Sequence, residues 1–122
     1  MWIRRWLAVD QWAYDGGANQ KWTLTYLNNG LYQLTNVNSG LVLGATNKGK
    51  TDGTEMQQWS NLSGSNQEYI IRRTANDTDI AIINSNSGLA VEVPGASTSN
   101  GTVLDRWGEN GGTNQQWLLN TP

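Results

Sequence analysis

Short segments with apolar residues at every second position recur along the chain and end at polar turns. Residues 32–36 and 80–84 show this alternation, and each precedes an Asn/Ser-Gly turn. Such segments predict β-strands, and further strands are expected at residues 41–43, 89–93, 103–107 and 115–119. No helix of useful length is expected, because Gly and Asn interrupt every window. Short strands at roughly ten-residue spacing predict an all-β barrel or a similar closed array.

The sequence also repeats itself with a period of about 48 residues. Residues 36–43 (NVNSGLVL) return at 84–91 (NSNSGLAV), and Trp59 returns at Trp107. A step of 47 residues back from Trp59 leads to Trp12. The half-unit around Trp12 therefore occurs three times, whereas the half-unit with Ser-Gly occurs twice. A fixed period of this length indicates a repeat architecture.

We expect one domain over residues 1–122, with repeat units at about 1–28 (partial), 29–76 and 77–122. The first unit begins eleven residues before Trp12, whereas the others begin about 27 residues before Trp59 and Trp107, so roughly two strands are absent from it. This absence would leave strand edges and core side chains uncovered. A truncated or engineered chain could cover the gap with residues 2–6 (WIRRW) or with a second copy of itself. The alternative is a fragment that tolerates an open side.

Composition changes the picture of the core. The chain has 122 residues and a mass of 13.4 kDa, which is enough for one domain. Only 37% of the residues are hydrophobic, and the aromatic residues are seven Trp and four Tyr with no Phe. Because Trp and Tyr carry a polar group on an apolar body, we expect a small, Trp-rich core and aromatic side chains that face polar ligands.

Charge and residue types exclude several classes of function. A net charge of −2 provides no basic surface for nucleic acid or anionic lipid, so neither a nucleic-acid partner nor membrane insertion is expected. The absence of Cys and His removes thiolate and imidazole catalysis and the usual zinc ligands, and no metal or cofactor is expected. No apolar run approaches the ~20 residues of a membrane helix, and no signal peptide is visible.

Three Gln-x-aromatic segments keep step with the repeat: Gln20-Lys21-Trp22, Gln67-Glu68-Tyr69 and Gln115-Gln116-Trp117. With the Asn-Ser-Gly-Leu turns and the upstream Trp residues, they resemble the ricin-B-type lectin family, which also occurs as carbohydrate-binding modules of glycosidases. The resemblance covers the chain from about Leu7 to Leu119. It implies a β-trefoil with three repeats around a pseudo-threefold axis, glycan partners and an extracellular location. It also implies that Trp22, Tyr69 and Trp117 are core residues.

The same resemblance implies one shallow sugar pocket per repeat. Each pocket would use an acidic residue after the second strand, a polar residue two positions before an aromatic platform, the platform, and the Asn-Gln of the Gln-x-aromatic segment. The implied residues are Glu92, Asp105, Trp107, Asn114 and Gln115 in the third repeat, Gln57, Trp59, Asn66 and Gln67 in the second, and Asp10, Trp12, Asn19 and Gln20 in the first.

These residue types suit a pyranose on physical grounds. One face of the sugar ring is apolar and packs on a flat aromatic side chain such as Trp107. The hydroxyl rim needs acceptors and donors, and carboxylates such as Glu92 and Asp105 accept charge-assisted hydrogen bonds. Gly44 stands where the second repeat would need its carboxylate, so we expect a weakened or inactive second site. Glu92 is one methylene longer than the Asp usual there, which would alter sugar preference.

We therefore expect non-catalytic binding of galactose- or xylose-type glycans, with the third repeat as the best candidate site. An enzyme is disfavoured, although Glu92 and Asp105 are the residue types of a glycosidase pair, because the family's sites are shallow and no third group tunes either pKa. The remaining alternative is a truncated or engineered scaffold, or a protein-binding or inhibitory trefoil, whose sugar residues are idle.

Overall fold

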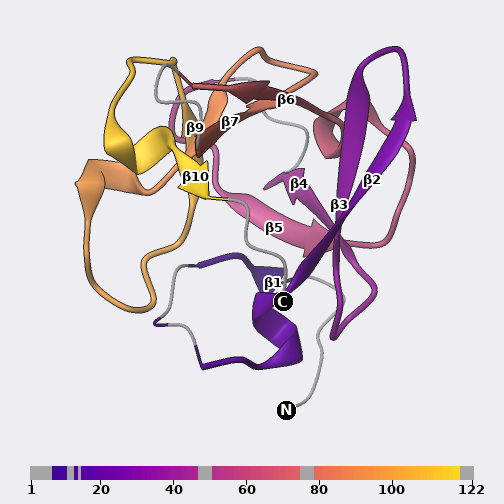
Figure 1. Cartoon of the computed structure of the whole chain (residues 1–122), viewed down its shortest axis with the longest axis horizontal. Helices are drawn as coiled ribbons and strands as arrows, with labels where there is room; N and C mark the ends of the chain where they lie inside the picture. Colours follow the sequence, from indigo (N-terminus) through magenta and orange to yellow (C-terminus); the bar gives the residue numbers. More distant parts are fainter. Residues whose placement is uncertain (1–6, 11–12, 14, 47–50, 75–78, 119–122) are drawn as a thin grey trace.

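The structure is a computed structural model that describes residues 7–10, 13, 15–46, 51–74 and 79–118. Trp12, residues 2–6 and the expected unit boundary between 76 and 77 lie outside this range. The described part is built from β-strands and three-residue 3-10 turns (Figure 1). The strands are β1 (Leu7–Ala8), β2 (Trp22–Asn28), β3 (Leu31–Asn36), β4 (Val42–Ala45), β5 (Met56–Trp59), β6 (Tyr69–Arg73), β7 (Asp79–Asn84), β8 (Ala90–Glu92), β9 (Asp105–Trp107) and β10 (Trp117–Leu118). The 3-10 turns are η1 (Ala18–Gln20), η3 (Ser65–Gln67), η4 (Pro94–Ala96) and η5 (Thr113–Gln115).

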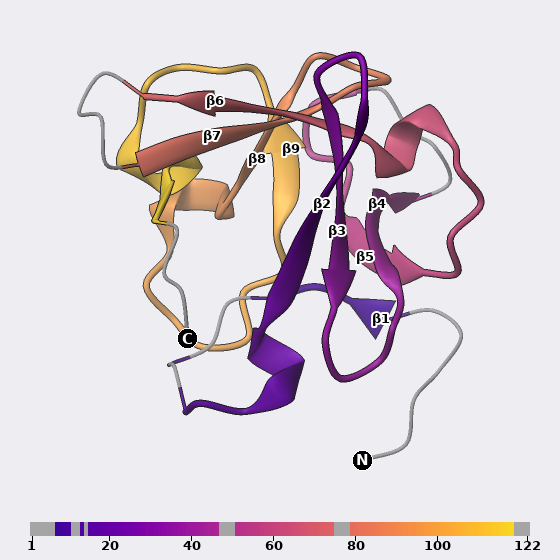
Figure 2. The same cartoon turned by 45° about the vertical axis from the view of Figure 1, so that its right-hand side comes forward.

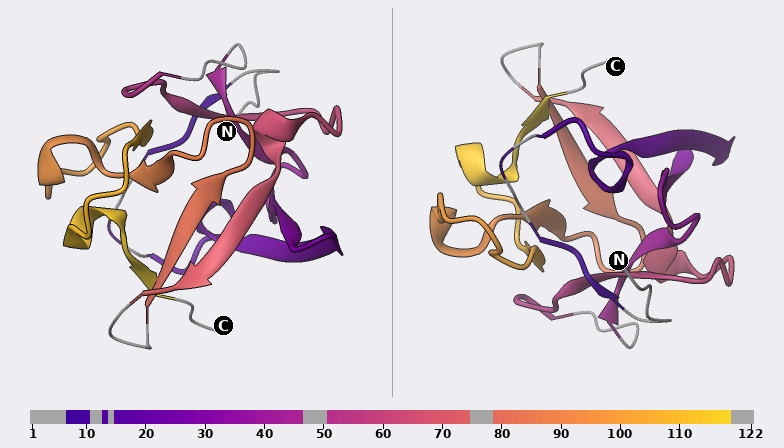
Figure 3. Two further views of the ribbon diagram at one scale, coloured as in Figure 1. Left: turned by 90° about the horizontal axis from the view of Figure 1, so that it is seen from above. Right: turned by 90° about the horizontal axis from the view of Figure 1, so that it is seen from below.

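All of these strands pair antiparallel in one sheet of order β1-β5-β4-β3-β6-β7-β8-β9, with β2 on β3 and β10 on β7. The two longest hairpins are β2–β3 and β6–β7 (Figure 2). Seen from above and below, the orange and yellow loops near the C-terminus lie on the opposite side from the β2–β3 hairpin (Figure 3).

A ring of backbone hydrogen bonds joins the three repeats. The N–H of Val9 donates to the carbonyl of Met56 at 3.1 Å, Met56 donates to Leu104 at 2.8 Å, and Leu104 donates back to Val9 at 2.8 Å. These three residues are spaced by 47 and 48 positions, which is the period of the sequence. The backbone therefore has a pseudo-threefold axis, and the expected β-trefoil is confirmed.

The core is a cluster of buried side chains from β4, β5, β6, β7 and β8 and from the residues next to β8 and β9. Tyr69 is fully buried and packs with Met56, Leu43 and Val91, among others. Trp22 and Trp117 pack against the same cluster, and the indole N–H of Trp117 donates to the carbonyl of Val91 at 3.1 Å. Of the three aromatics of the Gln-x-aromatic segments, Tyr69 is a core residue, and Trp22 and Trp117 are half-buried against the core.

Three predicted strands are shorter than expected, one of them 89–93, of which β8 covers Ala90–Glu92. The prediction of a strand over 115–119 is wrong at its start, because Gln115 lies in η5 and β10 begins at Trp117. A 3-10 turn forms there because the N–H of Gln115 reaches the carbonyl of Gly112 at 3.0 Å, which follows the Gly-rich loop 108–112. Similarly, β9 begins at Asp105, and Val103 makes only an isolated bridge with Asp10.

Strand pairing differs among the described parts of the three repeats. β2 pairs with β3, and β6 pairs with both β3 and β7. Within the described residues, the equivalent strand β10 pairs only with β7, through Trp117 opposite Ile80. The edge of β10 on which a first-repeat strand would lie therefore has no described partner.

Candidate functional site

The Gln of each Gln-x-aromatic segment holds the loop that precedes it. The side-chain amide of Gln115 donates to the carbonyl of Gly108 at 3.0 Å, and its oxygen accepts the N–H of Asn110 at 2.9 Å. Gln67 makes the same pair of bonds with Ser60 and Leu62, and Gln20 makes it with Ala13 and Asp15. A side chain with one donor group and one acceptor can satisfy both ends of a loop. This arrangement makes each Gln a support for its loop.

The acidic residues of the third repeat face each other across two strands. Glu92 ends β8 and lies directly opposite Asp105, which begins β9. Both side chains are buried, at 5% and 7% exposure. Glu92 Oε1 accepts the side-chain amide of Gln115 at 3.1 Å and faces that of Asn114 at 3.5 Å. Asp105 Oδ1 is buried and has no hydrogen-bond partner among the described residues.

The environment of Asp105 is strongly acidic. Burial, a hydrogen bond with Glu92, and the negative charges of Glu92, Glu55 and Asp52 raise the pKa of Asp105 from 3.8 to about 7. Glu55 comes from the second repeat and forms a β-bridge with Asp105. Two carboxyl groups that share a hydrogen bond retain a proton more readily than isolated acids do. Asp105 therefore gains or loses its proton near neutral pH.

An open hollow of about 350 Å³ lies beside this pair. Trp107 lines it with a side chain that is 44% exposed. Asn114 also lines it and donates to the carbonyl of Val93 at 2.9 Å, which directs its amide toward the strand that ends in Glu92. The complete lining is Glu92, Pro94, Gly95, Ala96, Asp105, Trp107, Asn110 and Asn114. Four of the five residues expected in the third repeat therefore share one hollow, and Gln115 lies buried behind them.

Sequence reasoning missed Asn110, the η4 residues and the acidic neighbours of Asp105. Asn110 lies in the Asn-Gly-Gly segment, where Asn favours turns, and its oxygen accepts the N–H of Gly112 at 2.8 Å. The Asn-Gly-Gly segment was therefore a sequence signal for a turn at Asn110. Glu55 and Asp52 belong to another repeat and approach Asp105 only through the threefold closure, so no local pattern could have found them.

The second repeat carries the expected residues in a different setting. Gly44 and Gln57 are opposite each other on β4 and β5, at the positions that Glu92 and Asp105 occupy in the third repeat. A Cβ at Gly44 would lie 3.1 Å from the Gln67 side chain, so a larger residue there requires that side chain to move. Asn66 donates to the carbonyl of Ala45 at 3.2 Å, and Trp59 is half-buried. No carboxylate of the second repeat stands at these positions.

The first repeat is less complete. Asp10 is exposed and bridges to Val103, and burial of part of its carboxyl group raises its pKa. Asn19 is exposed, and its carbonyl accepts the side-chain amide of Asn36 at 2.9 Å. Gln20 supports its loop as described above. Trp12 lies outside the described residues.

Within the described ranges, no cluster of three or more acidic residues has a geometry that could hold a metal ion. The same part of the chain contains no helix with the length and apolarity needed to cross a membrane.

The threefold backbone and the Gln-supported loops define a β-trefoil domain. A family model described as "Ricin-type beta-trefoil lectin domain-like" matches residues 7–59, 18–107 and 65–122. The chain therefore belongs to the ricin-type β-trefoil lectin family. A comparison with curated proteins finds no match.

Solved structures with a similar backbone include designed and natural proteins. The designed threefold-symmetric protein ThreeFoil is 36% identical, with a TM-score of 0.88 over 91% of this chain and 79% of that chain. The exo-beta-1,3-galactanase 1,3Gal43A from Clostridium thermocellum is 30% identical, with a TM-score of 0.85 over 88% of this chain but only 23% of that enzyme. The Macrolepiota procera ricin B-like lectin, solved in complex with lactose, is 23% identical, with a TM-score of 0.84 over 94% of this chain and 80% of the lectin.

Proposed function

We propose that the chain is a non-catalytic carbohydrate-binding domain that takes a galactose- or xylose-type residue into the third-repeat hollow. The observation that carries this proposal is that the acidic residues Glu92 and Asp105 line the same hollow as Trp107, whose side chain is 44% exposed. The ring offers an apolar surface for the C–H face of a sugar. Carboxyl oxygens of Asp105 and Glu92 accept from its hydroxyl groups, and the ionised member of the pair gives the charge-assisted hydrogen bond.

Each residue of the third-repeat set has a distinct role in this proposal. Asp105 and Glu92 are the acceptors, Trp107 is the platform, and Asn114 supplies an amide at the rim. Gln115 is a support, because its donor atoms already serve Gly108 and Glu92. Membership of a lectin family supports carbohydrate binding at the level of the class. The lactose complex of the Macrolepiota procera lectin is consistent with a galactose-type ligand.

A binding role fits the acidic pair better than hydrolysis does. Glycosidases that use two carboxyl groups hold them at about 5 Å or more so that the sugar fits between them. Glu92 and Asp105 are instead directly opposite each other on paired strands, and both are buried, so they approach a bound sugar from one wall of the hollow and do not flank a glycosidic bond. The hollow is also open, so water is not excluded from it.

The other two repeats are proposed as weaker sites. Gln57, Trp59, Asn66 and Gln67 offer amides and an aromatic ring but no carboxylate. Asp10, Asn19 and Gln20 have no counterpart of Glu92 among the described residues. If more than one repeat binds, a multivalent glycan gains avidity without any new contact.

Intrinsic Trp fluorescence during sugar titration tests the proposal. Galactose, lactose, xylose and xylo-oligosaccharides are compared with glucose, and a saturable, sugar-selective change at millimolar concentration is expected. Asp105→Asn and Glu92→Gln are expected to weaken binding at least about tenfold, because each removes a charge-assisted acceptor.

Glu68→Gln is the matched control, since it makes the same acid-to-amide change at a half-buried residue outside the hollow. It should bind as the wild type does. A folded wild-type protein without any sugar response would contradict the proposal and favour the scaffold or protein-binding alternative.

We also propose that the chain associates with a second copy through the edge of β10. This edge has no described partner, whereas the equivalent strands β2 and β6 each pair with the strand that follows them. Unpaired strand edges template pairing with other chains. Leu118 on β10 is 61% exposed and adds an apolar contact to the same edge.

A further inference from the structure

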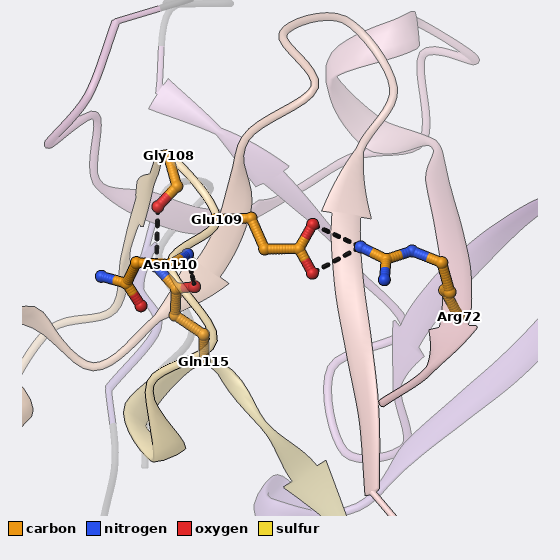
Figure 4. Close-up of polar contacts among 5 residues, drawn as sticks. All are labelled: Arg72, Gly108, Glu109, Asn110 and Gln115. Carbon is orange, nitrogen blue, oxygen red and sulfur yellow. Dashed lines mark hydrogen bonds and ion pairs between the residues drawn. The ribbon is translucent and has the colours of Figure 1, made fainter. Parts of the chain in front are cut away.

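An ion pair connects the second repeat to the loop of the third-repeat hollow. Arg72 lies on β6, and its Nη2 atom donates to both carboxylate oxygens of Glu109 (Figure 4). Glu109 follows Gly108 in the loop that leads away from Trp107. The hydrogen bond and the charge of Glu109 raise the pKa of Arg72 above its ordinary value. The pair is therefore a direct tie between two repeats.

The loop held by this pair also shapes the hollow. Its residues Gly108 and Asn110 are bonded to Gln115, as Figure 4 shows. On one side of the loop, Asn110 and Trp107 line the sugar hollow. On the other side, Glu109 and Gly111 line a second hollow of about 180 Å³ that Arg72 also borders. Glu109 is thus the loop residue that reaches away from the sugar hollow.

The second repeat holds the equivalent loop differently. Asn61 stands 48 positions before Glu109, and it exchanges amide hydrogen bonds with Gln33 on β3 at 2.9 and 3.5 Å. Gln33 lies opposite Thr25. In the third repeat, Ala81 takes the place of Gln33 and lies opposite Arg72. The equivalent positions of the third-repeat anchor therefore hold Arg72, Ala81 and Glu109 in place of Thr25, Gln33 and Asn61.

The size of the side chains explains this difference between the two repeats. Ala81 has no side chain that could reach the loop, and it lines the 180 Å³ hollow next to Arg72 and Glu109. The space that a Gln side chain would fill is therefore free for the long Arg72 side chain, which reaches toward Glu109 from the neighbouring strand. Thr25 is too short to make such a contact. The loop therefore has an anchor in both repeats, with an ionic tie where the amide pair is missing.

We infer that Arg72 is a positioning residue for the third-repeat sugar site, holding Trp107 and Asn110 in place through Glu109. This inference rests on the proposed function for its effect on sugar affinity, whereas the anchoring itself is independent of sugar. The side chains of Arg72 and Glu109 are 50% and 39% exposed. Exposed ion pairs contribute little and are screened by salt, so the effect is modest and depends on ionic strength.

Two measurements on Arg72→Met test the inference. At low ionic strength the variant is expected to bind sugar about two- to fivefold more weakly than the wild type. The difference should shrink at high salt, because screening removes the tie from the wild type as well. The backbone amides of Asn110 and Gly112 are expected to exchange hydrogen faster in the variant. Lys21→Met makes the same charge change in the first repeat and is expected to alter neither property.

A variant that carries the second-repeat contact in the third repeat tests whether the anchoring can be restored. The triple variant Arg72→Thr, Ala81→Gln, Glu109→Asn copies the second-repeat set into the third repeat. It should restore wild-type affinity and slow exchange, but without the dependence on salt. If Arg72→Met does not fold, Glu109→Gln removes the same pair from the loop side and is read in the same way.

The outcomes separate this inference from the proposed function. Wild-type affinity and wild-type exchange in both Arg72→Met and Glu109→Gln would overturn the inference. An equal loss of affinity at low and high salt would also overturn it, because a general structural defect does not respond to screening. If the wild type binds no sugar, the proposed function fails, and the exchange rates alone decide whether Arg72 anchors the loop.

Discussion

Asp105 is an acid surrounded by other acids. Its folded-state pKa of about 7 lies above the ordinary value of 3.8, so between these values the folded protein holds a proton that the unfolded chain releases. The free energy of unfolding should therefore fall as pH rises from about 4 to about 7 and then level off. Asp105→Asn removes this titration, and its stability should change less with pH over that range.

Urea unfolding at several pH values checks this prediction. The difference between wild type and variant is expected to change by on the order of a few kcal/mol across the range. Because the raised pKa comes from burial and from neighbouring carboxylates, Glu68→Gln should keep the wild-type profile. Parallel profiles for wild type and Asp105→Asn would show that Asp105 titrates normally in the folded protein.

Single residues also show what the sequence could predict of the site. Glu92, Asp105, Trp107 and Asn114 were predicted together and share one hollow. The resemblance implied a common pocket for these residues, and the strands and turns of one repeat bring them to the same hollow, whereas their role in sugar binding stays a prediction. The effect of Glu55 on the pKa of Asp105 was not predicted, because the two residues meet only when the second repeat packs against the third.

At the scale of elements, the turn after β7 depends on a buried cation. Arg106 on β9 is fully buried, and its Nη1 atom donates to Asn84 at 2.6 Å, Ser87 at 2.7 Å and Asn86 at 2.9 Å. In the second repeat, Gln58 stands at the equivalent position and accepts the Ser39 hydroxyl at 2.5 Å. The same turn is therefore held by a cation in one repeat and by a neutral amide in the other.

Substitution of Arg106 tests this difference. Arg106→Ala removes the donor of three side-chain hydrogen bonds, one of them to the buried Asn84, and is expected to lower the free energy of unfolding by about 2–4 kcal/mol. Arg106→Gln copies the second repeat and should cost less, since an amide can still donate to the turn. Thermal and urea unfolding of the two variants provide the comparison. Equal losses would mean that the volume of Arg106, and not its hydrogen bonds, supports the turn.

The strands themselves were largely predictable, whereas their ends were not. Alternation located β3 and β7 to within one residue, because half-buried strands need apolar side chains on one face. The start of β10 was missed because the hydrogen bonds of the Gln115 side chain favour a 3-10 turn there. Side-chain hydrogen bonds of this kind compete with strand pairing and leave no periodic pattern.

At the scale of the whole molecule, the proposed self-association through the edge of β10 can be tested by the oligomeric state. Light scattering and sedimentation over a wide range of protein concentration should detect a dimer or larger species. Leu118→Lys places a charge on the exposed edge strand and is expected to shift the protein toward the monomer. Leu62→Lys is the matched control, because Leu62 is similarly exposed, at 64%, in a loop. A strictly monomeric wild type that unfolds cooperatively would contradict self-association.

The hydrogen-bond ring of Val9, Met56 and Leu104 uses only backbone atoms. Side chains at equivalent positions of the three repeats can therefore diverge without altering these contacts between the repeats. Gly44 and Gln57 illustrate such divergence, since the second repeat keeps its strand pairing without the acids of the third. A molecule built in this way can specialise one pocket and let another lapse, and a lapsed pocket is a natural starting point for a new specificity.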